Sequence, residues 1–156
     1  MTDIIIRPAR PGELKIVQDL NHELFLSDQR HFGDLNLDWP YQEDGEEYFT
    51  QLVNGESGVC YVAEVEGKVI GYAAGGIMYK HSAYNGKRAE LENMFVKAEY
   101  RSQGIGGKLV DAFFAWAKSQ QADMAVVNAF SPNTQAIAFY EHAGFEPYSV
   151  YLMKKL

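Results

Sequence analysis

The chain has 156 residues and a formal net charge of −7, with 47% hydrophobic and 22% charged residues. This length and composition predict one soluble globular domain, residues 1–156, with enough apolar material for a sizeable core. The negative charge argues against a general nucleic-acid binder, which needs a basic face to neutralise phosphates, and no apolar run has the length of a membrane span.

The first half of the chain predicts one strand, two helices and a hairpin. A short strand is expected at residues 3–9, and an apolar stripe at helical spacing predicts a helix over 12–28. Gly33, Pro40 and Gly45 then predict a loop, so the second helix is expected only from 46 to 54. Residues 59–79 predict two strands joined by a turn at Glu66-Gly67.

The second half predicts alternating strands and helices. We expect a strand at 87–97, a helix at 105–120, a buried strand at 122–130, a short helix at 133–144 and a last strand or hairpin at 145–156. The order β-α-α-β-β-β-α-β-α-β is typical of a mixed sheet in one α/β domain.

The N-terminus lacks a basic stretch followed by a long apolar run, so it is not expected to be a signal peptide, and the cytoplasm is the expected compartment. Cys60 is the only cysteine, which excludes an internal disulfide, and its strand-like surroundings favour a buried hydrophobe over a nucleophile. The four histidines are not spaced with carboxylates as metal ligands are, so no metal is expected.

A glycine-rich turn, "RSQGIGGK" at residues 101–108, opens the helix at 105–120. The first N–H groups of a helix have no partner within it, which makes such a turn suitable for an anion. It does not fit the dinucleotide-binding fingerprint, because Leu109 stands at the third glycine position, nor a Walker loop, because Ser102 stands at the first.

Two motifs resemble the GCN5-related N-acetyltransferases. The stretch "LENMFVKAEYRSQGIGGKL" at 91–109 is similar to that family's strand and [QR]-x-x-G-x-[GA] turn, and "NAFSPNTQAIAFYEHAGFEP" at 128–147 is similar to its N-x-x-A-φ-x-[FL]-Y-x-x-x-G-F motif. The resemblance extends over residues 87–148, and "IIIRPA" near the N-terminus is a common opening in the family. It implies a single-domain acyl-CoA N-acyltransferase fold, with a mixed, mostly antiparallel splayed sheet flanked by helices.

The resemblance also implies acetyl-CoA as co-substrate. Its pyrophosphate would lie on the N–H groups of residues 103–107, where Gly104 and Gly106 permit close approach. The pantetheine arm would pair with the backbone at a bulge in the preceding strand, although the side chains there could equally be core residues. The cofactor-binding residues it implies are Met94, Phe95, Val96, Arg101, Ser102, Gln103, Gly104, Ile105, Gly106, Gly107, Lys108, Asn133 and Tyr140, where Asn133 could instead be only a helix N-cap.

Acetyl transfer to an amine needs a neutral nucleophile and a proton for the departing thiolate. Tyr140 stands where the family usually has a tyrosine near the CoA sulfur, which would suit a general acid. The alternative is that Tyr140 only packs against the last strand. Glu90 and Glu92 are the candidates for the general base, against the alternatives of a surface ion pair or a water chain. The resemblance implies direct transfer in a ternary complex.

The acceptor is expected to be a primary amine of a small molecule or of a protein, and the negative charge slightly favours a cationic small molecule. The residues that could line its pocket are Glu23, Asp34, Asp38, Trp39, Tyr41 and Tyr79. A homodimer is possible because dimers are frequent in the family. The rival interpretations are a non-catalytic CoA-binding or sensing module, and a structural domain whose glycine turn is accidental.

Overall fold

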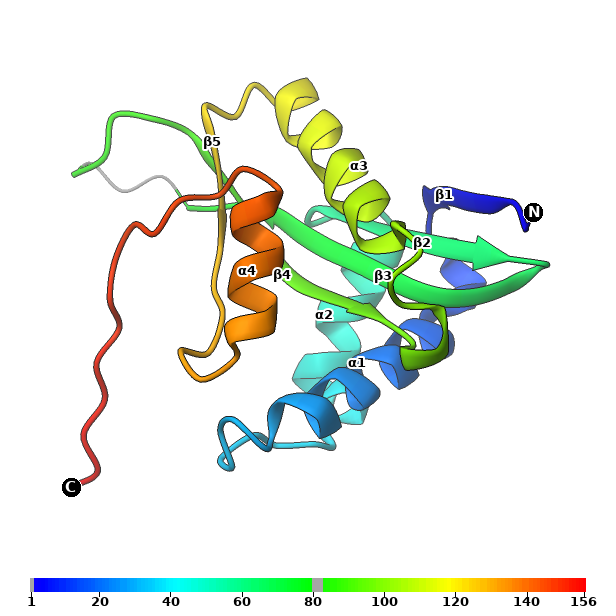
Figure 1. The fold of residues 1–156 in the computed structure, drawn as a ribbon. Coiled ribbons are helices and arrows are strands. Elements are labelled where there is room, and N and C mark those ends of the chain that lie inside the picture. Colours follow the sequence, from blue (N-terminus) through cyan, green and yellow to red (C-terminus); the bar gives the residue numbers. More distant parts are fainter. Residues whose placement is uncertain (1, 80–82) are drawn as a thin grey trace.

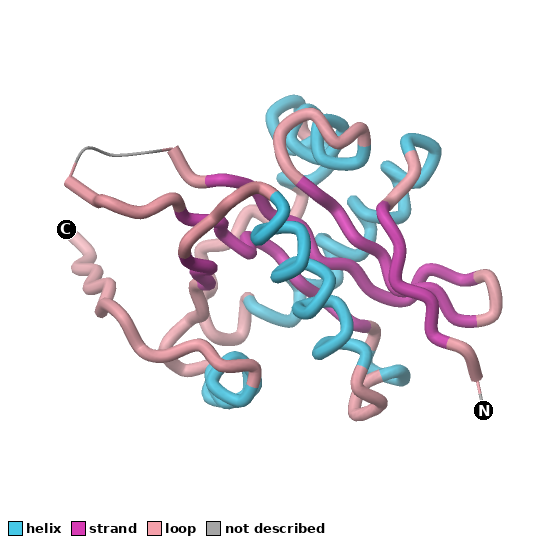
Figure 2. Tube along the Cα trace, turned by 90° about the horizontal axis from the view of Figure 1, so that it is seen from above, coloured by secondary structure: helices cyan, strands magenta, loops and turns pink. Residues whose placement is uncertain are grey.

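In the computed structural model, residues 2–79 and 83–156 are described. A five-stranded sheet of order β1-β2-β3-β4-β5 lies between helices on both of its faces (Figures 1 and 2). Its strands are β1 (Ile4–Pro8), β2 (Val59–Val65), β3 (Lys68–Ile77), β4 (Arg88–Val96) and β5 (Met124–Val127). The helices are α1 (Leu14–Asp28), α2 (Glu43–Val53), α3 (Ile105–Ser119) and α4 (Thr134–His142), with short 3-10 turns between.

Each face of the sheet has its own core. Side chains of α1 and α2, such as Leu20 and Phe49, pack with Tyr72 of β3 on one face. Side chains of α3, such as Phe113, pack with Leu91 of β4 on the other face, and α4 joins that layer. Adjacent positions on a regular strand point to opposite faces, so Ala89 and Leu91 of β4, which pack in the α3 core, point away from α1 and α2.

The β2–β3 hairpin confirms the predicted turn. Glu66 and Gly67 have φ of 50° and 77°, the left-handed pair that a two-residue hairpin turn requires. The strand before the glycine turn and the helix after it also lie where the pattern predicted them, as β4 and α3.

Helix α2 begins earlier than predicted, at Glu43 instead of 46. Gly45 lies inside the helix and does not break it. A Cβ there would lie 1.9 Å from the carbonyl oxygen of Trp39, so this glycine permits a close approach of the preceding turn. The acidic residues of the first turn, Glu43, Asp44 and Glu46, favour this start because they face the positive end of the helix dipole.

Two predictions for the C-terminal part are wrong. The strand expected at 122–130 is reduced to β5, and it is half-buried to exposed instead of buried, because among the described strands only β4 pairs with it. Residues 145–156 form no strand or hairpin in the single chain and run out as an extended tail (Figure 1). A strand must pair with another to satisfy its backbone, and residues 145–156 pair with no described strand.

The sheet splays between β4 and β5, as the family resemblance implied. The two strands run parallel and pair only through residues 88–91 and 124–127. A register shift opposite Ala74 and Gly75 leaves Glu92 as an extra residue of β4, a bulge. Beyond it β4 continues to Val96 with β3 on one side and no described strand on the other.

Candidate functional site

The glycine turn follows the free end of β4 after a short 3-10 turn, Ala98–Tyr100. Gly104 is the N-cap of α3 with φ of +79°, a conformation that residues with a side chain rarely adopt. Among the described residues, the N–H groups of residues 103–107 donate no hydrogen bond, and the first in the helix with a partner is that of Lys108, to the Gly104 oxygen at 3.1 Å. These N–H groups and the positive end of the helix dipole form a place for an anion.

The three glycines of this turn have different reasons to be glycine. Beyond its φ, Gly104 has nothing within 4 Å of where a Cβ would lie, and Gly107 is equally open. A Cβ on Gly106 would lie 3.1 Å from the ring of Phe139 on α4. Gly106 therefore lets α3 and α4 pack closely, a role that the spacing of the turn did not indicate.

Arg101 is tied to the strand that precedes it. Its Nε donates to the Val96 oxygen at 2.8 Å, and its guanidinium lies 5.2 Å from the centre of the Phe95 ring. The charge beside the turn is thus held in place by the end of β4. The side chains of Phe95 and Val96 are buried, so only the backbone edge of this strand end faces the splay.

Tyr140 lies on α4, and its ring packs against those of Phe139 and Phe145 at 5.3 and 5.7 Å. Burial, with a further contribution from the charge of Asp28, raises the pKa of Tyr140 to about 12. No hydrogen bond links its hydroxyl to another described residue. The phenol is therefore protonated near neutral pH and free to donate. Asn133 is the N-cap of the same helix, and its Oδ1 accepts from Ala136 N at 3.1 Å.

Glu90 precedes Leu91, which is buried in the α3 core, so Glu90 belongs to the opposite face with α1 and α2. Glu92 lies on that side too, because its partner Tyr48 is a residue of α2. Burial, and then the charge of Glu92, raises the pKa of Glu90 above its usual range. Glu92 is the exposed bulge residue, and it accepts a short hydrogen bond from the Tyr48 hydroxyl.

A buried polar network lies behind Glu92, and sequence reasoning missed it. Asn93 Nδ2 donates to the Tyr48 hydroxyl at 2.9 Å. Asn21 Nδ2 donates to Asn93 Oδ1 at 3.3 Å and to the Tyr72 hydroxyl at 2.9 Å. Burial, together with the charge of Glu92, raises the pKa of Tyr48 far above its usual range. The network joins α1, α2, β3 and β4, so no local pattern could have revealed it.

The residues expected at the acceptor pocket do not form one cluster. Trp39 lies among rings, 6.0 Å from Phe25 and 5.4 Å from Tyr48. Glu23 lies 3.6 Å from Lys97, and the Tyr41 hydroxyl donates to Asp19 at 2.7 Å. Four of the expected residues are exposed: Asp34, Asp38, Tyr41 and Tyr79.

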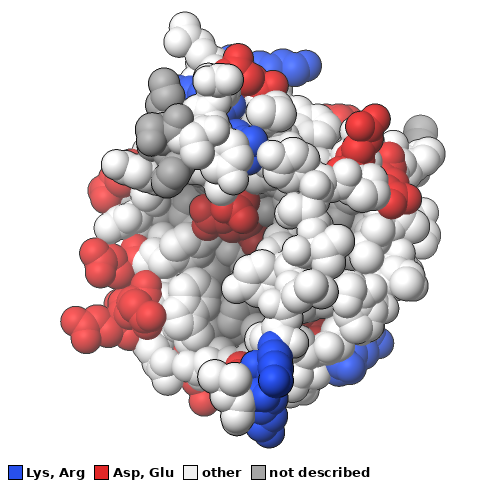
Figure 3. All heavy atoms as spheres, turned by 90° about the vertical axis from the view of Figure 1, so that its left-hand side faces the viewer, with Lys and Arg blue, Asp and Glu red and all other residues white. Residues whose placement is uncertain are grey.

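Two loops meet on this side of the molecule. The rings of Phe32, after α1, and Phe130, after β5, stack at 5.3 Å, which brings the loop before α2 beside the free end of β5. On the face drawn in Figure 3, acidic side chains lie beside a central hollow and at the edge of the face, while lysine and arginine side chains lie toward its upper and lower ends.

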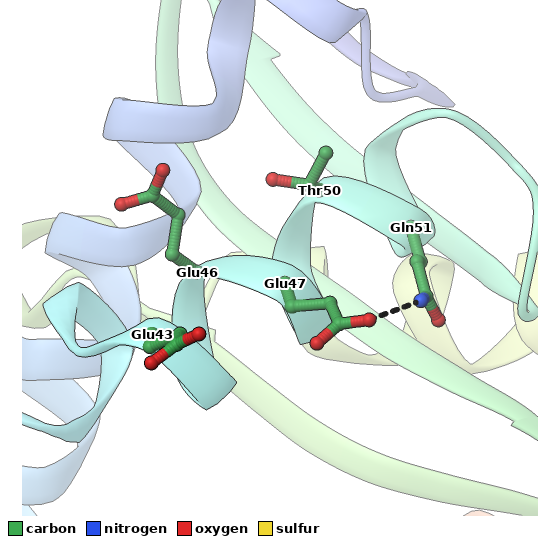
Figure 4. A pocket seen from close by; sticks show the side chains of 5 residues that line it. All are labelled: Glu43, Glu46, Glu47, Thr50 and Gln51. Carbon is green, nitrogen blue, oxygen red and sulfur yellow. Dashed lines mark hydrogen bonds between the residues drawn. The ribbon is translucent and has the colours of Figure 1, made fainter.

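A hollow of about 430 Å³ lies elsewhere, over α2 alone, and its lining is Glu43, Glu46, Glu47, Thr50 and Gln51 (Figure 4). No residue of β4 or of the glycine turn contributes to it. It is an open surface of one helix, apart from the groups described above. No group of three or more metal-ligating side chains occurs among residues 2–79 and 83–156, and no described helix is long and apolar enough to cross a membrane.

Cys60 is buried in the core between the sheet and the two N-terminal helices. Burial raises the pKa of its thiol to about 12, so it is almost entirely protonated near neutral pH. Only the thiolate is a good nucleophile. The predicted role of Cys60 as a buried hydrophobe is therefore confirmed.

Similar proteins agree on the fold. An aminoglycoside N-acetyltransferase solved in complex with CoA superposes with a TM-score of 0.76 at 16% identity, over 100% of this chain and 96% of that one. A thialysine N-epsilon-acetyltransferase of Bos taurus is 28% identical in an alignment of 158 positions, which covers 92% of this chain and 85% of that protein. An uncharacterised N-acetyltransferase of Methanocaldococcus jannaschii is 29% identical over 99 residues, and the aligned part is 44% of that protein.

The chain spans well under half the length of the first curated relatives it matches, 44% and 43%. It matches the family described as "Acetyltransferase (GNAT) family" over residues 18–145, which include the splayed strand, the glycine turn and Tyr140. The chain therefore belongs to the GNAT acetyltransferase family and has its acyl-CoA N-acyltransferase fold.

Proposed function

We propose that residues 1–156 form one acetyltransferase domain that moves an acetyl group from acetyl-CoA to a primary amine. The observation that supports this best is the junction at the end of β4. There an unpaired strand edge at residues 92–96 runs directly toward the free N–H groups at the start of α3. An extended arm with amide groups, followed by a pyrophosphate, is the chemistry that such a junction accommodates.

In this assignment the N–H groups of residues 103–107 hold the pyrophosphate, with Arg101 and Lys108 as nearby positive charges. The free edge of Met94, Phe95 and Val96 pairs with the pantetheine arm. Asn133 already uses Oδ1 as a helix cap, so its Nδ2 is the atom left for the arm. The solved aminoglycoside acetyltransferase with bound CoA supports acetyl-CoA as the donor.

The reaction we propose is direct. The amine nitrogen attacks the thioester carbonyl carbon, a C–N bond forms, and the C–S bond breaks as the thiolate leaves. Tyr140 donates its phenol proton to that sulfur, a role that suits a tyrosine kept protonated by its raised pKa. The nitrogen loses its second proton as the amide forms, and that proton returns through solvent to the Tyr140 phenolate, which restores the phenol. No acyl-enzyme is needed, since the Cys60 thiol is buried and protonated.

The proton of the incoming ammonium goes to a carboxylate on the α1–α2 face of β4. Glu90 is one candidate, because burial and then the charge of Glu92 raise its pKa above the usual range, which makes it a better proton acceptor than an ordinary carboxylate. Glu92 is the other candidate, because its carboxylate is held at the bulge by a hydrogen bond from the Tyr48 hydroxyl, which in turn accepts from Asn93.

We propose a cationic small molecule as the acceptor, with a protein amine as the second candidate, and the cytoplasm as the compartment. The net charge of the whole chain is −7, and a negative protein attracts amines that carry several positive charges. Two relatives support this class by name, a thialysine N-epsilon-acetyltransferase and an aminoglycoside N(6')-acetyltransferase of Stenotrophomonas maltophilia, which is 26% identical over 69% of this chain.

The first test measures thermal unfolding with and without acetyl-CoA for wild type, Gly107→Glu and Gly107→Gln. Nothing lies within 4 Å of a Cβ at this position, so both variants should fold, and each replaces a glycine in a helix with a better helix former. A carboxylate about 8 Å from the pyrophosphate costs about 2 kcal/mol at an effective dielectric of 20, or more than tenfold in affinity. We expect a rise in midpoint with acetyl-CoA that Gly107→Glu reduces and Gly107→Gln keeps.

Release of CoA with a panel of mono-, di- and polyamines then tests turnover. Turnover that is greatest with the polycations supports the enzyme and its acceptor class. Stabilisation by acetyl-CoA without release of CoA on any amine would favour the non-catalytic binding module. No stabilisation, or equal stabilisation of the two Gly107 variants, would overturn the assignment of the glycine turn.

A further inference from the structure

Asn21 on α1 is a polar side chain that the core encloses completely, with 0% of its surface exposed. Its Nδ2 donates to the Tyr72 hydroxyl at 2.9 Å and to Asn93 Oδ1 at 3.3 Å. Its Oδ1 has no hydrogen-bond partner among the described residues. An unpaired polar atom in a core costs stability, which indicates a role for this amide beyond packing.

The Tyr48 hydroxyl lies between Asn93 and Glu92 and has one proton to donate. Asn93 turns Nδ2 toward it, at 2.9 Å, so the hydroxyl accepts on that side and donates its proton to Glu92. An Asn93 amide turned the other way would present Oδ1, which would compete with Glu92 for the same proton. The orientation of this one amide therefore decides whether Tyr48 donates to Glu92.

Asn21 holds the Asn93 amide in the orientation that favours Glu92. Because Asn21 Nδ2 donates to Asn93 Oδ1, a turned Asn93 would place two NH2 groups against each other with no acceptor between them. The fully buried Tyr72 accepts from the same nitrogen of Asn21. The hydrogen bonds thus run in one direction, from Asn21 through Asn93 and Tyr48 to Glu92, and they join α1, β4 and α2.

We propose that Asn21 is a positioning residue for the proton-accepting step of acetyl transfer, because it directs the Tyr48 proton to Glu92 and so keeps that carboxylate at the bulge. This rests on the proposed function, in which Glu92 is a candidate proton acceptor and its charge acts on Glu90. Glu92 is exposed, so without the Tyr48 bond water takes the place of the hydroxyl and the side chain is free to rotate away. Asn21 acts through two other side chains, Asn93 and Tyr48.

The first experiment compares turnover in wild type and in Asn21→Leu, whose side chain has a similar size and no polar group. We expect kcat for CoA release to fall about tenfold, a part of the about 10²- to 10⁴-fold that a positioned base contributes, while KM for acetyl-CoA stays within about twofold. Asn21→Ser, whose hydroxyl is too short to reach Asn93, should repeat the loss, and it replaces the leucine variant if that one does not fold.

Gln18→Leu is the matched control. Gln18 is another buried amide of α1, and it donates to the Pro40 oxygen at 2.7 Å, outside this network. Its replacement costs a buried hydrogen bond on the same helix and should leave kcat near that of wild type. Equal losses of kcat in Gln18→Leu and Asn21→Leu, or no loss in Asn21→Leu, would contradict a positioning role.

A double-mutant cycle with Tyr48→Phe tests whether the effect passes along the hydrogen bonds. Two independent losses multiply, whereas two losses that share one path do not. Once Tyr48 has no hydroxyl, Asn21→Leu should lower kcat by less than about twofold further. A second full tenfold loss in the double variant would rule out the path through Tyr48.

The last measurement needs no turnover. The carboxyl carbon of Glu92 is observed by NMR in the free protein and assigned with Glu92→Gln. We expect Asn21→Leu to move this signal to the position that it has in Tyr48→Phe, and Gln18→Leu to leave it in place. If wild type released no CoA with any amine, the proposed function would fail, and this comparison would still decide whether Asn21 positions Glu92. A Glu92 signal that Asn21→Leu does not move would overturn the proposal, whatever the kinetics.

Discussion

Replacement of Tyr140 by phenylalanine removes the proposed proton donor and little else. The ring contacts with Phe139 and Phe145 persist in the variant, and the lost hydroxyl has no hydrogen bond with a described residue. The free energy of unfolding should therefore change by no more than about 0.5 kcal/mol. The affinity for acetyl-CoA should also persist, because other residues make the proposed pyrophosphate and pantetheine contacts.

The turnover number should fall about 10²- to 10⁴-fold, the usual contribution of a positioned general acid. The size of the loss should depend on pH. With a pKa of about 12, Tyr140 stays protonated across the whole working range. The departing thiol has a pKa of about 8.5. Above that pH the thiolate leaves without a proton, so the turnover number of the variant falls by a smaller factor.

The assay is steady-state release of CoA between pH 6 and pH 10, with acetyl-CoA affinity measured alongside. Tyr61→Phe is the matched control, since Tyr61 is a half-buried β2 tyrosine in the same core layer, with a pKa raised by burial alone. A turnover number within about threefold of wild type for Tyr140→Phe, or a loss that does not change with pH, would refute its role as the acid.

Two further predictions concern the network and the cysteine. Tyr48→Phe removes the donor to Glu92 and leaves Asn93 Nδ2 without its acceptor, so we expect unfolding to become easier by about 1–2 kcal/mol. We also expect the acidic limb of the pH–rate profile to move, because Glu90 sets that limb and the charge of Glu92 contributes to its raised pKa. An unchanged profile despite lower stability would show that Tyr48 contributes to packing alone. Cys60 should resist alkylation by iodoacetamide in the native state and react once denatured, because burial raises its pKa to about 12; rapid labelling of the native protein, read by mass spectrometry, would contradict this.

The predictions from the sequence that the structure confirms are those that depend on neighbouring residues. Two strand-like apolar runs on either side of a Glu-Gly turn are sufficient to locate the β2–β3 hairpin, and helical spacing locates α3. The glycine turn is equally local, because the φ of Gly104 and the missing partners of a helix start follow from the chain itself. The family, too, is recognisable from two short motifs.

Only the tertiary structure decided what distant residues do to one another. Asn21, Tyr48 and Asn93 look like ordinary polar residues in the sequence, yet they meet behind Glu92 because α1 and α2 pack on the same face of the sheet. Gly106 has the sequence context of a cofactor-binding glycine, yet the structure shows that its lack of a Cβ makes room for the ring of Phe139. The tail has the composition of a strand but forms none in the single chain, because composition gives a segment its preference and a partner edge determines whether it pairs.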